Sequence, residues 1–159
     1  MATKHSSGIL LYRDRDSVTE FLLIHPGGPY WAKRDEGAWS IPKGGIEGEE
    51  DSRTAALREL DEELGAAAPD LDPAELIELG SVRQRAGKVV DGWGAEGDFD
   101  PAALDSNTFE MEWPPRSGRE VVFPEVDRAD WFDLEAARRK LLPAQGEFLD
   151  RLLEHLDRG

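Results

Sequence analysis

The feature that most constrains the fold is a helical pattern over residues 49–64. Asp51 or Ser52 can cap the start of this helix, and Gly65 can end it. Apolar residues recur at the spacing of one helix face: Leu57, Leu60 and Leu64. The pattern therefore predicts a helix that packs on the core through a leucine stripe.

The same helix carries acidic residues on a second face. At about 100° per residue, Glu59, Glu62 and Glu63 fall within an arc of roughly 100°. Their like charges repel, and the chain already holds 34 acidic against 19 basic residues, a net charge of −15. A divalent cation would reverse the sign of this effect. Carboxylates with room for water suit Mg²⁺ or Mn²⁺, so the three glutamates predict a metal-binding face.

Neighbouring residues complete the pattern. Arg58 lies four positions before Glu62 and can orient its carboxylate through a charge-assisted hydrogen bond. Glu50 lies near the start of the helix, and Gly44 and Gly45 precede it. Glycine lets the backbone approach a ligand closely, and its carbonyl is a further oxygen ligand.

Written out, the segment is Gly44, five residues, Glu50, seven residues, and then Arg-Glu-Leu-Asp-Glu-Glu-Leu-Gly-Ala, which ends at Ala66. It resembles the signature of the Nudix hydrolase family at every chemically important position. The last position usually carries a larger aliphatic residue than Ala66, which affects packing more than chemistry. The resemblance implies an α/β fold, an α/β/α sandwich with a mixed central sheet, in which the signature forms a loop–helix–loop.

The resemblance also implies a chemistry: hydrolysis of a nucleoside diphosphate linked to another group. Glu59, Glu62 and Glu63 would hold one to three Mg²⁺ or Mn²⁺ ions, which neutralise the diphosphate and activate water. The Gly44 carbonyl and Glu50 would complete or support the metal site, and Arg58 would orient a glutamate. One of the three helix glutamates would be the general base, with Glu63 placed first.

Many family members recruit one more carboxylate from a later loop or strand. Glu120 is the first candidate and Glu112 the second. Each also fits the simpler interpretation of a solvent-facing strand residue.

The residues before the signature bear on the substrate. Trp39-Ser-Ile-Pro-Lys-Gly44 is similar to a pattern in Nudix enzymes that act on diadenosine polyphosphates and diphosphoinositol polyphosphates. Lys43 would offer its ammonium group to a phosphate. Two further basic groups are candidate phosphate contacts, or else balance neighbouring acids: Arg116 with Arg119, and Arg83 and Arg85 with Lys88.

The leading hypothesis is therefore a pyrophosphohydrolase of dinucleoside polyphosphates or nucleoside triphosphates. A diphosphoinositol polyphosphate ranks lower as a substrate, because so acidic a chain would handle a densely phosphorylated inositol poorly. A third hypothesis is a binding module that senses a nucleotide without cleaving it. Family members of that kind usually lose part of the glutamate set, which is complete here.

Composition sets the remaining expectations. The acidic charge argues against a nucleic-acid polymer and an anionic membrane surface as partners. Cysteine is absent, which excludes thiolate chemistry, and no apolar run is long enough to span a membrane. We expect one domain over residues 1–159, a cytoplasmic location, and a monomer or homodimer.

Strand and helix patterns along the rest of the chain support a sheet covered by helices. Residues 8–12 and 18–25 are expected to form a hairpin, and residues 94–105 a loop. The other expected strands are residues 39–42, 76–82, 88–93, 108–113, 120–123 and 129–132. Two further helices are expected over residues 133–140 and 144–156.

Overall fold

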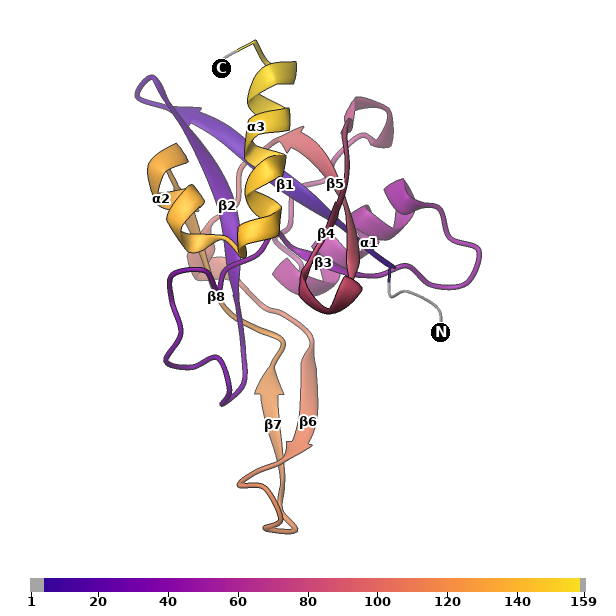
Figure 1. Cartoon of the computed structure of the whole chain (residues 1–159), viewed down its shortest axis with the longest axis vertical. Coiled ribbons are helices and arrows are strands. Elements are labelled where there is room, and N and C mark those ends of the chain that lie inside the picture. The colour runs from indigo at the N-terminus through magenta and orange to yellow at the C-terminus, as the bar shows by residue number, and fades with distance from the viewer. Residues whose placement is uncertain (1–4, 158–159) are drawn as a thin grey trace.

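A computed structural model describes residues 5–157 of the chain. A mixed sheet of six strands forms the centre of the molecule (Figure 1). Its strands follow the order β4-β5-β1-β2-β8, and β3 pairs with β1 beside them. Their bounds are β1 His5–Arg15, β2 Val18–Pro26, β3 Lys43–Gly45, β4 Ile77–Arg83, β5 Val89–Glu96 and β8 Val126–Phe132. The helices are α1 Ser52–Leu64, α2 Leu134–Lys140 and α3 Gly146–His155.

Strand β1 makes the sheet mixed, because it pairs antiparallel with β2 and parallel with β5. It is buried on both faces, as a central strand must be when helices cover both sides. Ile9 and Leu11 point to the apolar layer under α1, whereas Leu10 and Tyr12 point to the layer under α2 and α3. The predicted hairpin is confirmed, but β1 runs on to Arg15, beyond the predicted end of the strand at residue 12.

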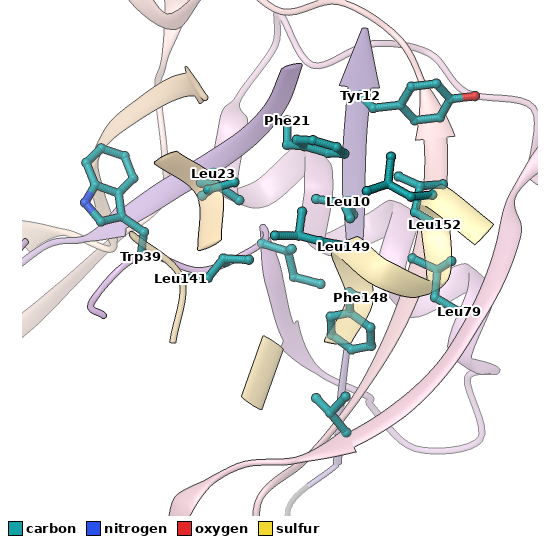
Figure 2. Packing of buried hydrophobic residues seen from close by; sticks show 14 of the residues in the cluster. Leu10, Tyr12, Phe21, Leu23, Trp39, Leu79, Leu141, Phe148, Leu149 and Leu152 are labelled. Carbon is teal, nitrogen blue, oxygen red and sulfur yellow. The ribbon is translucent and has the colours of Figure 1, made fainter. Parts of the chain in front are cut away.

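Helices cover both faces of this sheet, which confirms the α/β/α sandwich. The α3 side of the core is built by Phe148, Leu149 and Leu152 against sheet residues such as Leu10 and Leu79 (Figure 2). On the other face, α1 packs through Ala56, Leu60 and Leu64. The buried stripe thus uses Ala56, whereas Leu57 is only partly buried, and the small side chain of Ala56 lets α1 lie close to the sheet.

Helix α1 has the predicted caps. The Asp51 side chain accepts a 2.8 Å hydrogen bond from the Thr54 N–H. Gly65 ends the helix with a φ of 91°, a conformation that favours glycine. The helix begins at Ser52, three residues later than the sequence pattern indicates. Glu50 therefore lies in the loop before the helix.

The prediction of a strand over residues 39–42 is wrong in position. Trp39 and Ser40 form only isolated bridges, and the regular strand is β3, which starts at Lys43. Glycine-rich segments have low strand propensity, so this pairing depends on β1. Gly8 opposite Lys43 allows it, because a Cβ on Gly8 would come within 2.4 Å of the Pro42 carbonyl oxygen.

The loop expected over residues 94–105 begins later, because β5 continues through Glu96. Gly94 pairs antiparallel with Ile77, and a Cβ on Gly94 would come within 2.8 Å of a Leu152 methyl group. The glycine is therefore a contact point for α3 rather than the start of a turn.

A hairpin of β6 (Thr108–Glu112) and β7 (Glu120–Pro124) projects from the body of the molecule as a separate two-stranded sheet (Figure 1). Its predicted alternation is confirmed. The aromatic face packs on the loop after β2: Phe109 lies against Gly28, and the Tyr30 and Trp113 rings lie 5.4 Å apart. Within the described residues, no helix is long and apolar enough to cross a membrane.

Candidate active site

The carboxyl group of Glu59 lies directly against the backbone of Gly44. A Cβ on Gly44 would come within 2.1 Å of the Glu59 carboxyl carbon, so a larger residue would displace that side chain. Glu59 is only 8% exposed. Burial raises the pKa of its carboxyl group, the Arg58 hydrogen bond acts in the opposite direction, and repulsion by Glu62 adds to the rise. We call residues 43–50, which include β3, the glycine loop. This loop and α1 are in close contact at Gly44 and Glu59.

Glu63 lies one helical turn further on and is 7% exposed. Its Oε1 accepts a 2.8 Å hydrogen bond from the Lys43 backbone N–H. Burial raises the pKa of Glu63 to about 8, against the opposing effects of this hydrogen bond and the Lys43 charge. Glu59 and Glu63 are therefore two carboxyl groups, largely removed from water, that both contact the backbone at Lys43–Gly44.

Arg58 connects the loop to the helix. It binds both carboxylate oxygens of Glu50, at 2.8 and 2.9 Å, and donates at 2.8 Å to Glu59. It also donates at 3.2 Å to Glu62 and at 2.8 Å to the Gly45 carbonyl. The predicted contact with Glu62 is present, but the paired bonds to Glu50 are shorter. They hold the pKa of Glu50 at about 2, which makes Glu50 a partner of Arg58.

Glu62 occupies a different position from the other two helix glutamates. Its side chain is 40% exposed, and its hydrogen bond goes to Arg58. The sequence places the three glutamates on one arc, and the structure separates them into two buried residues and one at the rim.

Glu125 is a carboxylate that the sequence reasoning missed. It lies between β7 and β8, and its negative charge contributes to the raised pKa values of both Glu59 and Glu63. Its backbone is fixed by a 2.8 Å bond to the Asn107 carbonyl and a 2.9 Å bond from the Gly27 N–H. No periodic pattern marks this residue, because its position depends on the pairing of β8 with β2.

The four candidates from later in the sequence lie on the β6–β7 hairpin. Glu112 and Glu120 face each other across its strands, and Glu112 accepts a 2.6 Å bond from the Arg116 N–H. Arg119 accepts from the Trp113 N–H through its carbonyl. In the described part of the chain, no hydrogen bond or ion pair joins these four residues to the glutamates of α1.

Lys43 contributes a cation beside the carboxyl groups. Burial lowers the pKa of its side chain, while the nearby charges of Glu63 and Glu59 act in the opposite direction. The charges of Glu63 and Glu59 thus act on the Lys43 ammonium group, which the sequence predicts to contact a phosphate.

The donor set suits a hard divalent cation. Over residues 5–157, no three acidic or histidine side chains are already arranged as a metal site. However, Glu59 and Glu63 are buried carboxyl groups whose pKa values are raised by burial and by repulsion from neighbouring carboxylates, Glu62 and Glu125 for Glu59, and Glu59 and Glu125 for Glu63. A cation would compensate both effects. Oxygen donors of this kind match the ligand preference of Mg²⁺ and Mn²⁺.

Solved structures share this fold. The structure of an Ap4A hydrolase binary complex from Caenorhabditis elegans superimposes with a TM-score of 0.64 at 23% identity, covering 96% of this chain and 98% of that one. The NUDIX domain of Shewanella oneidensis NrtR, complexed with ADP ribose, gives 0.65 at 17% identity, covering 98% and 90%. At these identities the similarity shows the fold alone.

Curated relatives match over shorter stretches. An RNA pyrophosphohydrolase of Acidiphilium cryptum is 58% identical over 33 residues, 21% of this chain and 20% of the relative. One of Alkalilimnicola ehrlichii is 39% identical over 59 residues, 36% of this chain and 33% of the relative. The chain thus matches between a fifth and a third of the length of these relatives.

A comparison with models of protein families covers nearly the whole sequence. The model of the NUDIX domain matches residues 3–152, which include the glycine loop, α1 and Glu125. The mixed sheet and the paired carboxyl groups agree with this match. The chain therefore belongs to the NUDIX domain family.

Proposed function

We propose that this protein is a pyrophosphohydrolase, dependent on Mg²⁺ or Mn²⁺, that cleaves a nucleoside diphosphate linked to another group. The observation that carries the proposal is the pair of buried carboxyl groups, Glu59 and Glu63, that both contact the Lys43–Gly44 backbone. Such a pair is electrostatically costly in a chain with a net charge of −15, which suggests a role beyond stability.

Glu59, Glu62, Glu63 and the Gly44 carbonyl would hold the metal ions, and Glu50 would support them through Arg58. Glu125 is the carboxylate we favour as the additional ligand, because its charge acts on Glu59 and Glu63. Glu120 and Glu112 on the hairpin are the competing candidates. When bound, the metal supplies positive charge against the phosphate oxygens and activates water.

Groups of the protein itself orient the carboxylates and accept the proton of the attacking water. Arg58 fixes Glu59 and Glu62 by hydrogen bonds. The Lys43 N–H holds one oxygen of Glu63, which leaves the other oxygen to accept a proton from the attacking water. The Lys43 ammonium group would bind a phosphate oxygen of the substrate. Glu63 is thus our first choice as general base among the three helix glutamates.

We propose dinucleoside polyphosphates or nucleoside triphosphates as the substrate class. The motif from Trp39 to Gly44 supports this choice, as does the name of the C. elegans structural neighbour. The names of the curated relatives add a 5′-triphosphorylated RNA to the compounds that deserve testing. The acidic charge of the chain disfavours long nucleic acids and highly phosphorylated inositols.

The test is a product-identity assay on the purified protein with Mg²⁺, with Mn²⁺ and with EDTA. The panel would hold diadenosine tetraphosphate, the nucleoside triphosphates, ADP-ribose, NADH, a diphosphoinositol phosphate and a short 5′-triphosphorylated RNA. We expect metal-dependent cleavage of the first two classes. Tight nucleotide binding without turnover of any compound would instead identify a sensing module.

A further inference from the structure

The turn between β4 and β5 carries three basic residues that have no acidic partner within residues 5–157. Among the described residues, no ion pair joins Arg83, Arg85 or Lys88 to a carboxylate. Arg85 and Lys88 are also exposed. In a chain with 34 acidic residues, three basic residues clustered without a counter-ion are available to bind an external anion.

Hydrogen bonds between backbone groups close the turn. The Gln84 N–H donates at 2.7 Å to the Lys88 carbonyl, and the Gly87 N–H donates at 3.1 Å to the Gln84 carbonyl. Arg83 adds a 3.2 Å bond to the Gly87 carbonyl. These bonds hold the turn in one shape, so an anion would contact basic side chains that extend from a fixed backbone.

A buried amide fixes the turn beside the candidate active site. Gln145 is fully buried, and its Nε2 donates at 2.7 Å to the Gln84 side chain and at 3.0 Å to Ser40. Its Oε1 accepts at 2.9 Å from the Ile41 N–H, two residues before Lys43. One side chain therefore holds both the basic turn and the segment that leads into the glutamate site.

The charges agree with this placement. Besides burial, repulsion by Lys88 contributes to the lowered pKa of Lys43, in opposition to the attraction of Glu63 and Glu59. Lys88 thus acts on the same lysine as the two buried glutamates. The charge of Lys88 is therefore close enough to act on Lys43.

We propose that the β4–β5 turn is a second anion-binding site, which holds the polyphosphate chain of a substrate beyond the two phosphates of the cleaved diphosphate. This inference rests on the proposed function. Arg85 and Lys88 bind phosphate oxygens, Arg85 through its planar fork and Lys88 as a point charge. Substrates with three or more phosphates in a row reach the turn, whereas those with only two do not. The turn therefore selects triphosphates and tetraphosphates over compounds such as ADP-ribose.

The first experiment uses inorganic tripolyphosphate in EDTA, where metal-dependent turnover cannot occur, and follows the amide signals of the ¹⁵N-labelled full chain by NMR. We expect shifts at residues 84–88, with binding weakened about 5- to 10-fold in Arg85→Gln and in Lys88→Gln, the size expected for one surface charge. Arg15→Gln is the matched control, because it removes one exposed charge at the far end of β1. Equal binding by all four proteins, or no binding by the wild type, would overturn the inference.

A second experiment compares kcat/KM for diadenosine tetraphosphate and for ADP-ribose. The two turn variants should lose about 5- to 10-fold on the tetraphosphate and less than about 2-fold on ADP-ribose. Equal losses on both compounds would contradict selection by the turn. If no compound is cleaved and tripolyphosphate still binds at residues 84–88, the proposed function fails and the anion site stands.

Discussion

The Lys43 backbone N–H donates a 2.8 Å hydrogen bond to Oε1 of Glu63, twenty residues later in the chain. This bond joins the glycine loop to α1 and fixes the orientation of a carboxyl group that is 7% exposed. One residue further along the loop, Gly44 lies against the Glu59 carboxyl group. Loop and helix are therefore one unit, and the chemistry of the site depends on both.

Replacement of Glu63 by glutamine tests its role in catalysis. The amide oxygen of Gln can still accept from the Lys43 N–H, so the fold should persist, while the proposed metal ligand or general base is lost. We expect kcat to fall by at least about 10²-fold. Asp61→Asn, an exposed change on the same helix, should stay within about 2-fold of wild type. Retained activity in a Glu63→Gln protein that unfolds more easily would assign Glu63 a structural role.

The stability of the metal-free protein should depend on pH through Glu63. Its pKa in the folded protein is raised to about 8 by burial, from an ordinary value of 4.5. The folded state thus favours the protonated form, and this stabilisation is fully present below pH 4.5 and is lost as the pH rises through 8. We expect the free energy of unfolding, measured with urea in EDTA, to fall by on the order of a few kcal/mol between pH 5 and pH 9. In Glu63→Gln the free energy of unfolding should depend much less on pH. A dependence as steep as in the wild type would show that Glu63 is not its cause.

Gly44→Ala should impair activity much more than stability. The new Cβ would displace the flexible end of Glu59. This side chain can relax at a stability cost of about 1 kcal/mol, but the proposed metal ligand is then out of position. We expect kcat/KM to fall at least about 30-fold. Gly45→Ala is the control, since no atom lies within 4 Å of the added Cβ. Similar kinetics for the two variants would show that the Glu59 contact is unimportant.

Three single substitutions identify the additional carboxylate. We expect Glu125→Gln to lower kcat about 10-fold or more and to weaken Mn²⁺ binding, because its charge acts on Glu59 and Glu63. Glu120→Gln and Glu112→Gln on the hairpin should change either quantity less than about 2-fold. Metal titrations followed by calorimetry, together with kcat, separate the three. A larger effect at Glu120 than at Glu125 would restore the hairpin candidate.

The local parts of the site were predictable from the sequence. Asp51 and Gly65 cap α1 as expected, because capping depends on residues within one helical turn. The glutamates share a helix with the leucine stripe for the same reason, since helical geometry fixes their relative angles. The strand and helix pattern likewise indicated a sheet covered by helices, with errors mainly in the positions of strand ends.

The sequence by itself thus determined α1, its caps, and the glutamates and arginine that it carries, because these follow from contacts between near neighbours in the chain. Only the tertiary structure decided that Glu59 and Glu63 are buried while Glu62 stays at the rim. It alone brought the charge of Glu125 close to the glutamates and placed Gln145 between the basic turn and the segment at Ser40 and Ile41 that leads into the glutamate site. These contacts join residues far apart in the sequence, so they form only when the pairing of β3, β5 and β8 in the sheet is complete.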